Sequence, residues 1–446
     1  MPSPEITPEP NLAAHKWDKY LGTLWRHRDF RALWISLTIT HFGGQITFLA
    51  LPLTAAIMLN ATPTEMGILM AVEALPYTMF GLFTGVLVDR SRKLPLIIMA
   101  DVGRGLALLM VPIAAWMGWM SMWVLYTAGF LVGLGGIIGW ASYQVFMTER
   151  VGRENLVEAN SRIALTDSSS QLIGPGLAGL FIQWLTAPIA ILLDAISFFV
   201  SAWILRAIPP QESDAPKIAS PATWASVWAD AKEGLHMIWH NPILRSLAWG
   251  LAIWQFLKHI FLAIVILFAA RDLQLSAGTI GALWMMGGLG VLLATAIISR
   301  VNLRFGVGRV MIVGLSTTGL AWLLVASISA TSSLPALRLG AAIFVLDLGA
   351  LLFFINYLSL RQASTPDHLL GRVTSSMIFL SIACAPLGSM VGGLLGDAIG
   401  LRGAIAVAGV GGLLLGLLLM KVSPLMQMQT LPAHAKVAAP TEERSV

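Results

Sequence analysis

The strongest constraint in this sequence is a series of apolar runs, each long enough to cross a bilayer as a helix. By the rule that a spanning helix needs roughly 20 mostly apolar residues, we count about twelve spans. They lie near 32–58, 65–88, 94–116, 120–146, 163–185, 187–207, 242–269, 277–299, 308–330, 336–360, 372–396 and 400–420. These runs are far longer than the ~9–11 residues of a membrane strand and lack its alternation. The sequence therefore predicts an all-α membrane protein.

The distribution of basic residues predicts the orientation of these spans. Only 11% of the residues are charged, against about 25% in soluble domains, so the net charge of +5 indicates topology rather than a nucleic-acid site. Cytoplasmic loops carry an excess of Lys and Arg. If both termini are cytoplasmic, the outer loops hold little beyond Arg271, Arg338 and Arg402, and the inner segments hold Lys16, Lys19, Arg26, Arg28, Arg31, Arg90, Arg92, Lys93, Arg150, Arg153, Arg300, Arg304, Arg309, Arg361 and Arg372. We therefore expect both termini inside. No apolar core precedes Ala32, so we expect no cleavable signal peptide.

The longest internal loop divides the chain near its middle. It begins with the linker-like stretch from Pro209 to Asp214 and continues with apolar residues at helical spacing from Trp224 to Trp239. That spacing predicts an amphipathic helix along the cytoplasmic surface, either as a simple connector or as a regulatory element. The predicted organisation is a tail (1–31), a six-helix half (32–207), the linker (208–241), a second six-helix half (242–421) and a C-terminal tail (422–446).

Two pairs of short segments indicate that the halves are a repeat. Gly174-Pro175-Gly176-x-x-Gly179 has a counterpart beginning Ala385-Pro386, and Val88-Asp89 has one in Val301-Asn302 at nearly the same offset. Parallel repeats of this kind place a substrate site at their interface near the bilayer midplane. We therefore expect two pseudo-symmetric halves around a central cavity.

The loop after the second span carries the densest charge motif. Gly85 would allow close helix contact, and the acid Asp89 can pair with basic residues or with a helix N-terminus; the basic residues that follow are Arg90, Arg92 and Lys93. Opening the cytoplasmic side would break such contacts. The alternative is a basic cluster that only sets the membrane orientation and contains one acid by chance.

This loop resembles the signature loop of the major facilitator superfamily, Gly-x-x-x-Asp-Arg followed by basic residues, in the shortened form of the enterobactin-exporter and macrolide-efflux branch. Further stretches resemble that branch in the same order: Asp101-Val-Gly-Arg104, Glu149-Arg150-Val151, Leu156-Val-Glu-Ala-Asn160, Leu193-Asp194-Ala-Ile-Ser-Phe198, Glu233-Gly234 before Asn241-Pro242, and Gly371-Arg372-Val373. The resemblance implies a secondary transporter with twelve helices, working by alternating access.

The segment Gly174-Pro175-Gly176-x-x-Gly179 is similar to the glycine-proline motif of exporters in this superfamily. Pro175 removes a backbone donor and kinks the helix, and the glycines permit tight contact with a partner helix. The resemblance implies outward transport. A packing kink without directional meaning is the alternative.

Polar groups inside spans are costly, which makes them functional candidates. The resemblance implies that the first, fourth, seventh and tenth spans line the cavity, with the candidates His41, Gln45, Trp140, Gln144, Trp254, Lys258, Asp347 and Asn356. We hypothesise that Lys258 and Asp347 form an intramembrane pair; alternatively, Lys258 snorkels outward. Glu73 is a second candidate proton carrier or a structural acid.

The remaining intramembrane charges receive structural interpretations. We expect Asp101, Arg104 and Asp167 to brace the Asp89 loop, and Asp194 to be structural. The fourth span lacks a basic residue of the kind that many proton-coupled drug antiporters have, which weighs against their mechanism.

Other chemistry is weak in this sequence. It contains no G-x-x-x-x-G-K-[ST] loop and no H-E-x-x-H spacing, and the single Cys384 excludes an intramolecular disulfide. We expect no catalytic residues, cofactor or metal. The expected protein is a monomeric drug or siderophore efflux protein in the bacterial inner membrane, with a small-molecule substrate, membrane lipid and protons as partners. A lysophospholipid flippase or a metabolite importer of the same fold is the alternative.

Overall fold

The computed structural model describes residue 24 and residues 27–209, 224–331 and 334–429. The predicted tails and the start of the linker therefore lie largely outside the described residues. Within these ranges the chain is almost entirely helical and contains no strand. The all-α prediction is confirmed.

Six long helices form the N-terminal half, and each corresponds to one predicted span. They are α2 (Arg28–Met58), α3 (Pro63–Arg90), α4 (Lys93–Met117), α5 (Met122–Val151), α6 (Leu156–Leu185) and α7 (Ala187–Leu205). Side-chain hydrogen bonds cap the starts of α2 and α3. At α3, for example, Thr62 accepts from the backbone N–H of Glu65 while Glu65 accepts from that of Thr62, with Pro63 in the first turn.

The C-terminal half repeats this pattern with one fusion. Its helices are α9 (Pro242–Leu267), α10 (Ala277–Phe305), α11 (Val307–Ala326), α12 (Pro335–Ala363) and α13 (Leu370–Val422). α9 continues into a short π-helical turn, Phe268–Asp272. α13 consists of two helical segments, because Gly400 interrupts it with a φ of 78°, a left-handed conformation that glycine adopts without strain. The two segments are the last two predicted spans.

In the described part of the chain, nine helices are long and apolar enough to cross a membrane, and a tenth span is counted if the bent α3 is included. Two facts connect this number with the predicted twelve. α13 counts once although it contains two helical segments. α6 does not meet the apolar criterion for a span, because its first half is rich in polar residues, from Asn160 to Gln171. The fold is that of a multi-pass helical membrane protein with two six-helix halves.

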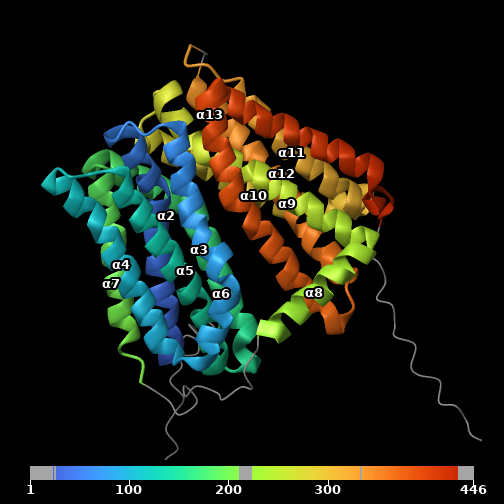
Figure 1. The fold of residues 1–446 in the computed structure, drawn as a ribbon, viewed down its shortest axis with the longest axis horizontal. Helices are drawn as coiled ribbons and strands as arrows, with labels where there is room; N and C mark the ends of the chain where they lie inside the picture. The colour runs from blue at the N-terminus through green and yellow to red at the C-terminus, as the bar shows by residue number, and fades with distance from the viewer. Residues whose placement is uncertain (1–23, 25–26, 210–223, 332–333, 430–446) are drawn as a thin grey trace, which may run out of the picture.

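The halves converge at one end of the molecule and diverge toward the other (Figure 1). The main contacts between them are those of α3 with α13 and of α6 with α10. The linker helix α8 (Trp224–His240) lies across the ends of α9 and α13 on the diverging side. There Glu233 pairs with Arg372, and Gly234 packs against the backbone of α13. A helix is thus present in the predicted range and packs on the C-terminal half, and its place on the cytoplasmic surface stays a prediction.

Candidate functional site

A cavity of about 260 Å³ lies between the two halves. α2 and α3 of the N-terminal half and α9 of the C-terminal half line it, with Phe48, Met70, Glu73, Ala74, Tyr77, His259, Leu262 and Ile266. Ligand sites are mostly apolar concavities with a few convergent polar groups. This cavity fits that description, with Glu73 and His259 as its ionisable groups.

Glu73 lies where α3 packs closely on α5. A Cβ added at Gly129 would lie 3.0 Å from Cγ of Glu73, and one at Gly133 would overlap the backbone oxygen of Glu73. The glycines of α5 thus allow the two helices to approach each other behind the acid. Within the described residues, no hydrogen bond or ion pair of the Glu73 carboxyl group is found.

The opposite wall of the cavity comes from the other half. His259 of α9 makes a 2.8 Å contact between Nδ1 and the carbonyl of Gln255. In the neutral ring this contact requires hydrogen on Nδ1, so Nε2 is left as an acceptor. Phe48 of α2 meets Trp284 of α10 edge-to-face, with 5.8 Å between ring centroids. The site is therefore shared between the halves, as the repeat predicts.

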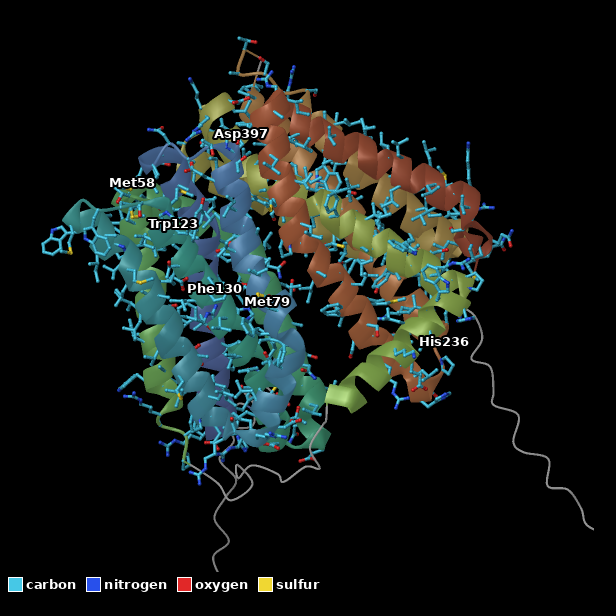
Figure 2. The ribbon with its side chains drawn as sticks, viewed as in Figure 1. Met58, Met79, Trp123, Phe130, His236 and Asp397 are labelled. Carbon is cyan, nitrogen blue, oxygen red and sulfur yellow. The ribbon has the colours of Figure 1, made fainter. Side chains whose placement is uncertain are left out.

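The converging end of the molecule is closed by direct contacts between the halves. Asp397 of α13 accepts from the backbone N–H of Thr64 at 3.0 Å. Arg271 donates to the carbonyl of Ala56 at 2.9 Å. This is the end that the charge pattern assigns to the outside. Figure 2 places Asp397 at this end and Met79 further along α3, toward the divergence.

Beyond the cavity, toward the divergence, the facing helices expose apolar side chains. Met79 and Phe83 of α3 are 51% and 46% exposed, and Ile378 and Phe379 of α13 are 47% and 44% exposed. Thr78 still donates to the carbonyl of Ile382 at 3.4 Å. The contact between α3 and α13 thus ends near the cavity, and these apolar side chains beyond it are exposed in this conformation.

The glycine-proline segment of α6 lies at the contact with α10. A Cβ on Gly281 of α10 would overlap the carbonyl oxygen of Pro175 and lie 2.9 Å from Cα of Gly179. Gly176 lies against Met285 of α10, and Gly174 packs under the side chain of Gln45 from α2. The motif therefore forms a close crossing between the halves. Its directional meaning stays a prediction.

Of the candidates on α2 and α5, none lines the cavity. His41 pairs with Asp167 of α6, with 3.4 Å between Nδ1 and the carboxylate. Gln45 packs on Gly174. Trp140 is 66% exposed, and Gln144 is exposed as well.

The candidates in the C-terminal half are mainly structural in this conformation. Trp254 is 5% exposed and donates to Thr318, so it belongs to the packed interior. Asn356 is 1% exposed and accepts from Asn302 at 2.8 Å. In this conformation neither residue lines the cavity, because each bonds to another residue inside the C-terminal half, and their expected cavity-lining role stays a prediction.

Lys258 and Asp347 face each other more loosely than we hypothesised. No direct ion pair joins them in the described residues. Instead, Nζ of Lys258 lies 5.1 Å from the centre of the Trp254 ring, and the Asp347 carboxylate packs against Gly287. The paired state stays a prediction for another conformation.

The charge motif after α3 is open in this structure. Gly85, Asp89, Arg90 and Arg92 are exposed, and a Cβ on Gly85 would meet nothing within 4 Å. Lys93 is 3% exposed, and its Nζ donates to the backbone oxygen of Asp89 at 3.5 Å. The motif lies at the diverging end, where a gate between the halves would be released.

A cluster inside the N-terminal half contains Asp101, Arg104 and Asp194. The sequence predicted that Asp101 and Arg104 brace the Asp89 loop, and the structure gives them other neighbours. Asp101 accepts from Ser201 at 2.6 Å, the Arg104 guanidinium lies 4.0 Å from the centre of the Phe198 ring, and Asp194 accepts from Thr47 and Ser197. These contacts join α2, α4 and α7 rather than brace the Asp89 loop. Asp167 pairs with His41 instead.

Sequence reasoning missed most of the cavity lining. His259 follows Lys258 and was passed over for it. Tyr77 lies one helical turn after Glu73, which was the available signal. Phe48 is one of many apolar residues in α2, and nothing in the sequence marks it. No group of three or more His, Cys, Asp or Glu residues that could hold a metal occurs in the described ranges.

Two six-helix bundles around a shared cavity form a transporter fold. The sequence model of the Major Facilitator Superfamily matches residues 33–263, more than half of the chain. The protein belongs to this superfamily, whose members are transporters and not enzymes.

Named relatives cover nearly the whole chain at low identity. The chain is 27% identical over 381 residues to the multidrug efflux pump Tap of Mycolicibacterium fortuitum, covering 84% of this chain and 90% of that protein. It is 24% identical over 415 residues to the enterobactin exporter EntS of Salmonella typhimurium, covering 91% and 95%. A solved bacterial homologue of the iron transporter ferroportin, in an inward-facing state, has a TM-score of 0.74 and 16% identity, covering 89% of this chain and 98% of that one. The last similarity shows the fold alone.

Proposed function

We propose that this protein exports an amphipathic small molecule, a drug or a siderophore, across the bacterial inner membrane by alternating access. The observation that carries the proposal is the cavity shared by α2, α3 and α9, which lies beside the contacts that hold the halves together at one end only. Breaking those contacts while the diverging ends close would expose the same cavity to the other side.

The proposed orientation places both termini in the cytoplasm. Its support is the alternation of Lys and Arg along the chain. With that orientation, the divergence and the exposed Asp89 motif are cytoplasmic, and the Thr64–Asp397 contact is extracellular. The halves 32–207 and 242–421 would rock as units, connected by the linker 208–241, in a monomer.

Export rather than import is supported by two independent observations. The glycine-proline segment of α6 forms the tight crossing with α10 that must rearrange when the outer end opens. Two relatives carry the names of an efflux pump and an exporter. Protons are the proposed coupling ion, because Glu73, Lys258 and Asp347 are ionisable groups within the spans.

Everted membrane vesicles test this proposal. The cargo panel contains ethidium, a catecholate siderophore and a lysophospholipid, each measured with an imposed proton gradient and again after an uncoupler has collapsed it. Vesicles without the protein are the control. Gradient-dependent accumulation of ethidium or the siderophore supports export by antiport. Accumulation of the lysophospholipid alone would support the flippase alternative, and accumulation of none would contradict the proposal.

A further inference from the structure

The cavity contains one acidic side chain, Glu73, for which no ion pair is found in the described residues. Glu73 lines the cavity, and no Lys or Arg is found among its described lining residues. The intramembrane cations Lys258 and Arg104 lie over the rings of Trp254 and Phe198, and in the described residues neither forms an ion pair with Glu73. A carboxylate in an apolar region is costly without a partner, so a positively charged group on the cargo would stabilise Glu73 where none of the described lining residues does.

The other residues that line the cavity suit the apolar part of an organic cation. Phe48 and Tyr77 present aromatic rings, and Met70, Leu262 and Ile266 supply apolar surface. Aromatic faces attract ammonium groups, and thioether side chains adapt to ligands of varied shape. His259 adds a hydrogen-bond acceptor through Nε2 when its ring is neutral. None of these groups would compensate a negative charge on the cargo.

The cavity also limits the size of the molecule it can hold. Its volume of about 260 Å³ lies just below the range of roughly 300–1,000 Å³ that is usual for drug-binding pockets. It accommodates a compact amphipathic molecule, or one aromatic portion of a larger one, with its charge beside Glu73.

We infer that this cavity selects a small amphipathic cation, an aromatic amine or quaternary ammonium compound, over an anionic chelator such as a siderophore. The inference rests on the proposed export function and narrows it to one of the two named cargo classes. An anionic cargo would place a second negative charge beside Glu73, and none of the described residues that line the cavity is a Lys or Arg.

The test compares two probes of opposite charge. Ethidium is the aromatic cation, and 2,3-dihydroxybenzoylserine is the anionic catecholate. Binding to the purified full-length protein in nanodiscs is measured by fluorescence anisotropy for ethidium and by equilibrium dialysis for the catecholate. Transport of both is measured in everted vesicles. The wild-type protein is expected to bind ethidium at least tenfold more tightly than the catecholate.

The Glu73→Gln variant keeps the shape of the side chain and removes its charge, and should weaken ethidium binding at least tenfold. Glu73→Asp keeps the charge and should retain most of the affinity, which separates charge from folding. Asp272→Asn is the matched control. It removes one carboxylate, but from the surface pair with Arg402 at 3.6 Å, and should leave ethidium binding unchanged.

The outcomes distinguish the inference from the export proposal. Equal ethidium affinity in the wild-type and Glu73→Gln proteins overturns the inference, as does tighter binding of the catecholate. Gradient-driven transport of the catecholate but not of ethidium overturns the inference while export stands. If no member of the wider panel is transported although ethidium binds in a Glu73-dependent manner, the cavity assignment stands and the export proposal fails.

Discussion

The contact between Gly281 of α10 and the kinked segment of α6 offers a way to change the conformational equilibrium with a single methyl group. A Cβ at this position would overlap the carbonyl oxygen of Pro175 and lie 2.9 Å from Cα of Gly179. Both obstacles are backbone atoms, so α6 and α10 must separate to admit the methyl. Overpacking of this kind costs about 1–3 kcal/mol.

That strain exists only where the two helices are in contact, which is the conformation closed at the Thr64–Asp397 end. We therefore expect Gly281→Ala to favour the conformation open at that end by about 5- to 150-fold, the ratio that corresponds to ~1–3 kcal/mol. Gly103→Ala is the matched control, because a Cβ there would meet nothing within 4 Å.

A buried reporter measures this shift. Ser389 is fully buried, and its carbonyl lies close to Gly67 across the same end of the interface. Ser389→Cys, in a Cys384→Ser background, should react slowly with a membrane-impermeant maleimide in the parent and faster once Gly281→Ala is added. An unchanged labelling rate in a folded, monodisperse Gly281→Ala protein would refute the reasoning.

Three further predictions concern stability, each read as thermal unfolding in detergent. Arg150→Met should lower the free energy of unfolding by about 3–5 kcal/mol, because Arg150 donates to the buried Asp29 at 3.1 Å; an unchanged Tm would contradict this. Thr47→Val should cost about 1–3 kcal/mol, because it removes a donor to the buried Asp194; full stability would mean that Ser197 suffices. Arg372→Gln should change stability by less than about 1 kcal/mol, because its pair with α8 is half exposed, and a large loss would show that the linker helix is needed for folding.

The helices were predictable because length and apolar composition decide them. The structure extends several predicted spans into the aqueous ends, as at α10, which reaches Phe305. Polar residues at those ends carry no apolar signal, although they continue the helix. α6 shows the opposite case: its polar first half fails an apolar criterion, yet the glycine-proline motif and the charge alternation placed a span there.

The site was less predictable, because a side chain's face depends on packing that one sequence does not display. Glu73 was identified from its cost in a membrane, and the structure places it in the cavity. Trp254 and Asn356 carried the same kind of signal, yet they bond to Thr318 and Asn302 inside the C-terminal half. His259 could be assigned to the cavity only once α9 and α3 were placed side by side.

The central claim is that one cavity between two rocking halves serves both sides of the membrane, and a reversible lock at the converging end tests it most directly. Thr64 and Asp397 are joined across the halves by a 3.0 Å hydrogen bond. In the Cys384→Ser background, Thr64→Cys with Asp397→Cys allows an oxidised cross-link there.

The measurement is gradient-driven cargo accumulation in everted vesicles, with the single-cysteine variants as controls. The account predicts that oxidation abolishes accumulation in the double variant and that a reductant restores it. Undiminished accumulation by fully cross-linked protein would contradict alternating access through this cavity.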